Sequence, residues 1–175
     1  MNNSIIFISG VCGVGKTSLI PFLKNMLDAK KYDIHDFDER GVPKGADGEW
    51  RRQESRYWMA LGKENGTKNK TTIVCGFSRP SELLALPDSD KIKIILLDIT
   101  SEMLKERLQG RYQTQESIAH LEAVAGDSVE KFIEDNINFA PTLRDECEKY
   151  QCPTIDTSAL TIEEVAQKVM ALIEN

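Results

Sequence analysis

The chain has 175 residues, 41% of them hydrophobic and 29% charged, so one globular domain over residues 1–175 can bury its own core. A net charge of −6 and scattered basic residues argue against a nucleic-acid partner. No apolar run approaches the roughly 20 residues that span a bilayer, and no basic stretch precedes an apolar segment. We therefore expect no membrane partner and a cytoplasmic location; the oligomeric state stays open.

The four cysteines form no Cys-x-x-Cys pair, and both histidines are distant from them in sequence. This spacing predicts small buried or half-buried thiols rather than a zinc site or a disulfide framework. Cys12 differs from the others because it lies inside a glycine-rich segment, where a thiol can be reactive.

Short apolar runs followed by turn residues predict five strands. They are Ile5–Ser9, Tyr32–Phe37, Thr71–Cys75, Ile92–Asp98 and Thr154–Ile155. Helical spacing of apolar residues and capping residues predict helices between them. These begin near Lys16, Trp50 (to about Glu64), Ser81 (to Leu86), Thr100 (to about Gln113), Glu116 (to Tyr150, interrupted at Gly126 and near Pro141) and Thr161.

Alternation of strands and helices favours an α/β fold with a parallel sheet of about five strands and helices on both faces. Ligands of such sheets bind beyond the carboxyl ends of the strands. The chemically informative segments of this chain all follow predicted strands.

The segment Gly10-Val-Cys-Gly-Val-Gly-Lys-Thr17 matches the phosphate-binding pattern Gly-x4-Gly-Lys-Thr, with a strand before it and a helix after it. Glycines let backbone N–H groups surround phosphates at the positive end of the helix. Lys16 is expected to reach the outer phosphates of ATP or GTP, and the Thr17 hydroxyl to bind Mg²⁺. The predicted nucleotide-binding residues of this loop are Gly10, Gly13, Val14, Gly15, Lys16, Thr17 and Ser18.

With this loop the chain resembles the small P-loop kinases, such as adenylate, shikimate and gluconate kinases. Asp36-Phe-Asp38 places two carboxylates at the end of the second strand, where one can serve the Mg²⁺ and the other can accept a proton. Shikimate kinase-like enzymes are similar here, which implies Asp36 for the metal and Asp38 for the acceptor hydroxyl. The alternative is a solvated acidic turn.

Gly76-Phe-Ser-Arg79 resembles the Gly-Phe-Pro-Arg of adenylate kinase, which implies that Arg79 contacts the acceptor. The same family has an aspartate where this chain has Cys75, so Asp36 or Asp38 must replace it or the site is impaired. Asp98 ends another apolar run that resembles a Walker B strand. In a kinase-like layout we expect the strand that ends at Asp98 to lie one position further from the phosphate loop within the sheet. We therefore favour Asp98 as a residue that precedes a helix.

Arg107-Leu-Gln-Gly-Arg111 resembles the start of the adenylate kinase lid. Arginines at i and i+4 share a helix face, and the resemblance implies that Arg107 packs on the base and that Arg111 binds phosphates in catalysis. The lid is then expected at about residues 111–126. Solvated arginines on a charged helix are the alternative.

The resemblance to these kinases implies that the region at about residues 39–66 binds the acceptor. Arg52 and Arg56, four apart, can present one face to an anion, although a solvated, salt-bridged helix is nearly as well supported. Together these features predict transfer of the γ-phosphoryl group of ATP to a small molecule, with Mg²⁺ as cofactor and Lys16, Asp38 and Arg111 as catalytic residues. Alternatives are a nucleoside or nucleotide kinase, and a nucleotide-dependent switch without an acceptor.

Overall fold

The computed structural model describes residues 5–174, which form an α/β fold around one sheet. All strand pairs in it are parallel, in the order β2-β3-β1-β4-β5. The strands are β1 (Ile5–Ser9), β2 (Tyr32–Asp36), β3 (Thr71–Cys75), β4 (Ile92–Asp98) and β5 (Thr154–Asp156). The expected five-stranded parallel sheet is thus confirmed.

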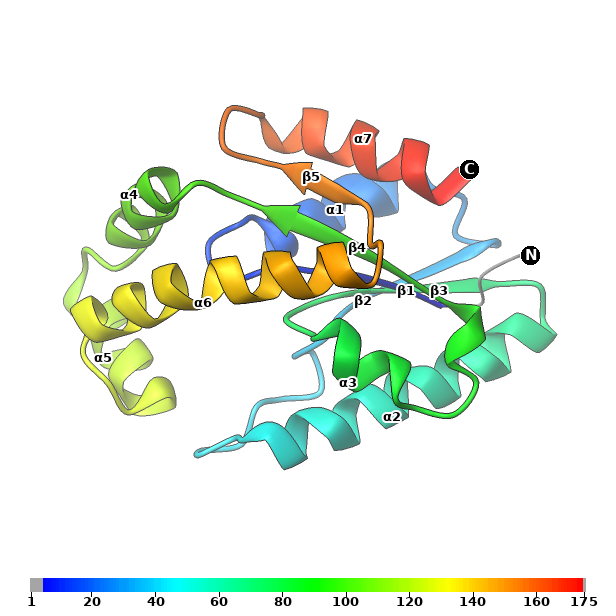
Figure 1. The fold of residues 1–175 in the computed structure, drawn as a ribbon, viewed down its shortest axis with the longest axis horizontal. Helices are drawn as coiled ribbons and strands as arrows, with labels where there is room; N and C mark the ends of the chain where they lie inside the picture. The colour runs from blue at the N-terminus through cyan, green and yellow to red at the C-terminus, as the bar shows by residue number, and fades with distance from the viewer. Residues whose placement is uncertain (1–4, 175) are drawn as a thin grey trace.

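Helices cover both faces of the sheet, as Figure 1 shows: α1 and α7 lie on one face, and α2, α3 and α6 on the other. The helices are α1 (Lys16–Met26), α2 (Gly48–Thr67), α3 (Pro80–Leu84), α4 (Ser101–Arg111), α5 (Gln115–Ala125), α6 (Val129–Lys149) and α7 (Ile162–Glu174). Among the described residues, no helix is long and apolar enough to cross a membrane.

Alternate residues of the central strand β1 face the two helical layers. Ile5 and Phe7 pack in a cluster with Trp58 of α2 and Leu83 of α3. Ile6 and Ile8 belong to the cluster that contains the buried residues of α1 and α7. A strand buried on both faces reads as a continuous apolar run, which is why β1 could be recognised from the sequence.

Several expected boundaries differ from those observed, and three of the differences have a clear physical cause. The predicted break near Pro141 is wrong, because α6 continues through it with Ala140 and Leu143 buried on either side; burial of this face offsets the loss of one backbone hydrogen bond. The helix predicted from Trp50 begins two residues earlier, since Asp47 accepts hydrogen bonds from two N–H groups of its first turn. Ser81 lies inside α3 rather than capping it.

Helix α2 packs very closely on β1. Its buried residues, Ser55, Trp58, Gly62 and Asn65, form one stripe along the helix. A Cβ atom at Gly62 would lie 2.8 Å from Cβ of Ile5. The absence of a side chain at this position therefore sets the distance between α2 and the sheet.

We expect Gly62→Ala to destabilise the protein by about 1–3 kcal/mol, because overpacking against Ile5 outweighs the higher helix propensity of alanine. Gly110→Ala is the matched control: a Cβ atom there has no neighbour within 4 Å. That change should stabilise the protein by about 0.5–1 kcal/mol. Urea unfolding of both variants measures the difference, and a Gly62→Ala variant as stable as the parent would contradict the close packing.

Candidate active site

The turn between β1 and α1 has three glycines with a positive φ angle, Gly10, Gly13 and Gly15. The φ angle is 155° at Gly10 and 102° at Gly15, values that residues with a side chain rarely adopt. A Cβ atom at Gly10 would also lie 2.6 Å from the carbonyl oxygen of Leu97. Only a chain that lacks side chains at these points can turn so tightly beside β4.

The N-terminus of α1 has no side-chain cap and no acidic residue in its first turn. The other helices longer than eight residues in the described chain are capped, by Asp47, Thr100, Thr114, Ser128 and Thr161. Free N–H groups and the helix dipole make an uncapped N-terminus attractive to an anion. The loop before α1 is therefore shaped to receive phosphate oxygens as the cap of this helix.

Lys16 folds back over this loop. Its Nζ donates hydrogen bonds to the carbonyl oxygens of Gly10 and Val11, at 2.7 and 2.8 Å. Burial lowers the pKa of Lys16, although the nearby charges of Asp38 and Asp36 oppose this shift. The amine thus lies where the outer phosphates of a nucleotide on this loop would lie.

Oxygen atoms from β2 and α1 meet beside the loop. The Thr17 hydroxyl donates to Oδ2 of Asp36 at 3.1 Å, and the Asp38 backbone N–H donates to Oδ1 of Asp36 at 3.0 Å. Mg²⁺ prefers oxygen ligands and takes one or two from a protein, with phosphates and water completing its shell. Thr17 and Asp36 fit such an ion.

The carboxyl group of Asp38 faces the same space with a raised pKa. Burial is the main cause, and the neighbouring Asp36 charge adds to it, while Lys16 and Arg51 act in the opposite direction. A carboxyl group with a raised pKa is a stronger base when it is ionised.

Cys75 lies at the carboxyl end of β3, where it pairs in register with Asp36. Burial, with the Asp36 charge as a smaller cause, raises the pKa of Cys75 to about 12. The thiol therefore stays protonated and cannot supply the negative charge of an acidic residue. Asp36, on the adjacent strand, is the nearest source of that charge.

Two arginines of α4 reach the cavity from the opposite side. Arg107 donates to the Thr157 carbonyl oxygen at 2.7 Å and to its hydroxyl at 3.3 Å. Arg111 lies 3.7 Å from Sγ of Cys12 in the loop. The predicted i, i+4 pair therefore does share one face, and Thr157 orients its first member.

These groups surround one cavity of about 480 Å³ beyond the carboxyl ends of β1, β2 and β3. It brings together most of the predicted residues: Gly13, Gly15, Lys16, Thr17, Ser18, Asp36, Asp38, Arg107 and Arg111. Gly10 and Val14 do not line it; Val14 is 1% exposed and packs in the core. Gly10 and Val14 therefore contribute to the shape of the loop and not to the cavity wall.

The acceptor-side arginines are placed differently from the prediction. Arg52 donates to Glu49 at 2.8 Å, and Arg56 lies 3.9 Å from the same carboxylate, both on the exposed face of α2. Arg51 is the half-buried one: its guanidinium lies over the Phe77 ring, 4.7 Å from the centroid, and Phe77 lines the cavity. Within residues 5–174, Arg51 forms no ion pair.

Arg79 does not line the cavity. Its guanidinium donates twice to Oε2 of Glu146, at 2.9 and 2.8 Å, and Glu146 also accepts from the Ser81 N–H. Burial alone would raise the pKa of Glu146, but these hydrogen bonds from Ser81 and Arg79 lower it. Arg79 would have to leave this ion pair to touch a substrate.

Asp98 is bound to Arg144 of α6 by two hydrogen bonds, at 2.5 and 2.9 Å. Its strand β4 pairs directly with β1. The expectation that this strand lies further from the loop is therefore wrong: β3 and β4 flank β1 on its two sides. Asp98 is absent from the cavity lining and serves the contact between β4 and α6.

No protein-family model matches the chain, and no curated protein matches it in sequence. Solved structures do match. A shikimate kinase from Bacteroides thetaiotaomicron is similar over 98% of each chain, with a TM-score of 0.61 and 17% identity. A gluconokinase from Sinorhizobium meliloti is similar over 99% of this chain and 94% of its own, with a TM-score of 0.60 and 16% identity.

The chain has a P-loop kinase-like fold. A tRNA isopentenylpyrophosphate transferase from Staphylococcus epidermidis also matches, over 97% of this chain and 98% of its own, with a TM-score of 0.59 and 10% identity. Identities this low show the fold alone. The group that is transferred has to be argued from the site.

Two polar residues that support this candidate site were given no role in the sequence analysis. Thr157 holds Arg107, and the Asn136 side chain of α6 accepts a hydrogen bond from the Cys12 N–H at 3.1 Å. Asn136 is 124 residues from Cys12 in the chain, so no local pattern could reveal it. Thr157, in contrast, follows a predicted strand at the ligand-binding edge, which was a usable signal.

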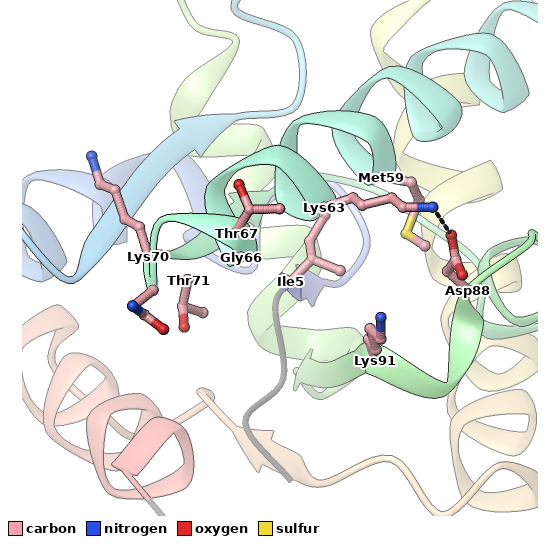
Figure 2. A pocket seen from close by; sticks show the side chains of 10 residues that line it. Ile5, Met59, Lys63, Gly66, Thr67, Lys70, Thr71, Asp88 and Lys91 are labelled. Carbon is pink, nitrogen blue, oxygen red and sulfur yellow. Dashed lines mark hydrogen bonds and ion pairs between the residues drawn. The ribbon is translucent and has the colours of Figure 1, made fainter.

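A second cavity, of about 400 Å³, lies at the opposite edge of the sheet. Figure 2 shows it at the start of β1 and β3, with Ile5, Met59 and Thr71 in its wall and the Lys63–Asp88 ion pair, 2.8 Å long, beside it. None of the predicted site residues lines this cavity. Because parallel sheets bind ligands at their carboxyl edge, it is not the candidate active site.

We expect Asp36→Asn to weaken nucleotide binding about 10- to 100-fold when Mg²⁺ is present and to leave it unchanged in EDTA, because the change removes a charge beside the metal position. Isothermal titration calorimetry measures both. Asp33→Asn is the control on the same strand, since Asp33 bonds to Asn65 and Lys70 instead. An equal loss with and without Mg²⁺ would show that Asp36 supports only the loop.

Proposed function

We propose that the chain is an ATP-dependent phosphotransferase that moves the γ-phosphoryl group to a hydroxyl of a small molecule. One observation carries the proposal: the uncapped phosphate loop with Lys16 and the carboxyl group of Asp38 line one cavity. A donor phosphate on the loop and an acceptor hydroxyl at Asp38 would then be neighbours, which is the main requirement of phosphoryl transfer.

Each side of the cavity has its own task in this proposal. The loop N–H groups and Lys16 hold the phosphates, and Thr17 and Asp36 would hold Mg²⁺. When it is bound, the metal ion neutralises charge on the β- and γ-phosphate oxygens. Arg111 and Arg107 lie on the far side, where Arg111 would stabilise charge on the transferring group and Arg107 would pack on the base.

Asp38 is the proposed base. Its carboxylate would accept the proton of the attacking hydroxyl, and its raised pKa improves that role at neutral pH. Arg51, beside it, would bind an anionic or strongly polar part of the acceptor. Arg52, Arg56 and Arg79 were predicted to bind the acceptor. Each of them forms an ion pair with a glutamate of the protein, and that ion pair would have to break before the side chain could bind a substrate.

Two other functions each have one supporting observation. A nucleoside or nucleotide kinase is favoured by the Arg107–Arg111 pair, which lines the cavity as the resemblance to adenylate kinase implies. A nucleotide-dependent switch is favoured by Cys75, whose protonated thiol takes the place of an acidic residue. Slow hydrolysis of the nucleotide without any acceptor, together with a protein partner that binds only one nucleotide state, would favour the switch.

The deciding experiment compares the parent protein with Lys16→Ala. We expect ATP and Mg²⁺ to give heat of binding and thermal protection in the parent, with turnover on at least one member of a panel of sugar-like, cyclic and nucleoside acceptors. Loss of Lys16 should lower turnover at least about 10²–10³-fold, because it removes charge stabilisation of the transferring group, while the unfolding temperature stays close to that of the parent. Undiminished turnover in the variant would contradict the proposal.

The rate should fall as the pH is lowered through the pKa of Asp38, because only the carboxylate accepts a proton. Arg51→Ala removes a positive charge that lowers this pKa, so the acidic limb of the pH–rate profile should move to higher pH. Arg52→Ala is the matched control, since Arg52 points away and pairs with Glu49. If the acidic limb lies at the same pH in both variants as in the parent, the pKa of Asp38 does not determine that limb.

A further inference from the structure

The end of α6 brings two cysteines together. Gln151, just beyond the helix, has a φ angle of 55°. The Cys152 N–H donates to the Cys147 carbonyl oxygen at 2.8 Å, and the Gln151 N–H donates to that of Glu148 at 3.0 Å. This pair of hydrogen bonds defines a Schellman motif, and a contact between the side chains at the positions of Cys147 and Cys152 often accompanies that motif.

We propose that Cys147 and Cys152 form a reversible disulfide bond that ties the end of α6 to the start of β5. A disulfide requires Cα atoms roughly 4.4–6.8 Å apart, and the hydrogen bond between the two backbones keeps these residues close. Cys147 belongs to the core cluster against which Cys152 packs. Both are free thiols in this structure.

The two cysteines differ in a way that suits a reactive and a resolving thiol. Cys147 is 0% exposed, whereas Cys152 is half-buried and open to small oxidants. The hydrogen bond from the Cys147 thiol lowers the pKa of Cys152, and the same bond, with burial, raises the pKa of Cys147. Cys152, the more exposed of the two, is therefore the thiol that reacts with the oxidant first.

With hydrogen peroxide as the oxidant, the Cys152 thiolate attacks one oxygen, the O–O bond breaks, and the other oxygen leaves as hydroxide, which becomes water. The Cys147 sulfur then attacks the sulfenic acid on Cys152. An S–S bond forms, the S–O bond breaks, and a second water leaves with the proton of Cys147. The two thiols lose two electrons in total, and a dithiol reductant restores them.

The pair is separate from the proposed kinase site, so the test does not depend on activity. Its neighbours link it to two other elements: Glu146 binds Arg79 next to α3, and the Pro153 carbonyl oxygen accepts from the Leu96 N–H of β4. A disulfide here would fix the segment that joins these contacts.

The reduced protein is treated with one equivalent of hydrogen peroxide, quenched with catalase and unfolded, and its thiols are counted. The reduced chain has four thiols, and we expect the loss of two, fully reversed by dithiothreitol. Trypsin without reductant cuts after Arg144 and Lys149, which places Cys147 and Cys152 in different peptides, 145–149 and 150–168. Mass spectrometry should find these two peptides linked.

Cys12→Ser is the matched control, because it removes the thiol in the phosphate loop and should leave the linked peptides unchanged. Cys152→Ser should abolish them. Four remaining thiols, a Cys152 sulfenic acid that never yields the linked peptides, or a disulfide that joins two chains or involves Cys12 would each overturn the proposal.

Discussion

The rest of the site depends on the free N–H groups at the start of α1. Polar residues cap the other long helices in residues 5–174, and here glycines turn the chain without supplying any cap. An anion is the natural partner of such a terminus. Because the sheet is parallel, the segments after β2 and β4 reach the same edge of the sheet, so Asp38 and Arg107 line the same cavity as this terminus.

Charge within the cavity is balanced locally rather than by the protein as a whole. The net charge of −6 would repel a polyphosphate. Lys16 and the two arginines of α4 offset this repulsion at one side of the cavity, whereas the carboxylates of Asp36 and Asp38 gather at the other. The division suits a highly charged donor and an acceptor that must lose a proton.

The sequence predicted those features that depend only on residues close together in the chain. The phosphate loop, the Thr100 and Thr161 caps and the buried strands all depend on neighbours within a few residues. The orientation of α2 was not predictable, because its buried stripe includes Ser55, Gly62 and Asn65, which do not look like a core face. Arg51 lies on the same stripe and so points inward, while the predicted Arg52 and Arg56 point to solvent.

Helices α2 and α5 differ in how closely they pack on the rest of the protein. In α2, Gly62 packs so closely against Ile5 that no space remains between this helix and the central strand. Helix α5, in contrast, has only one buried residue among those described, Leu121. Helix α5 is therefore held to the rest of the protein by fewer buried side chains than α2 is.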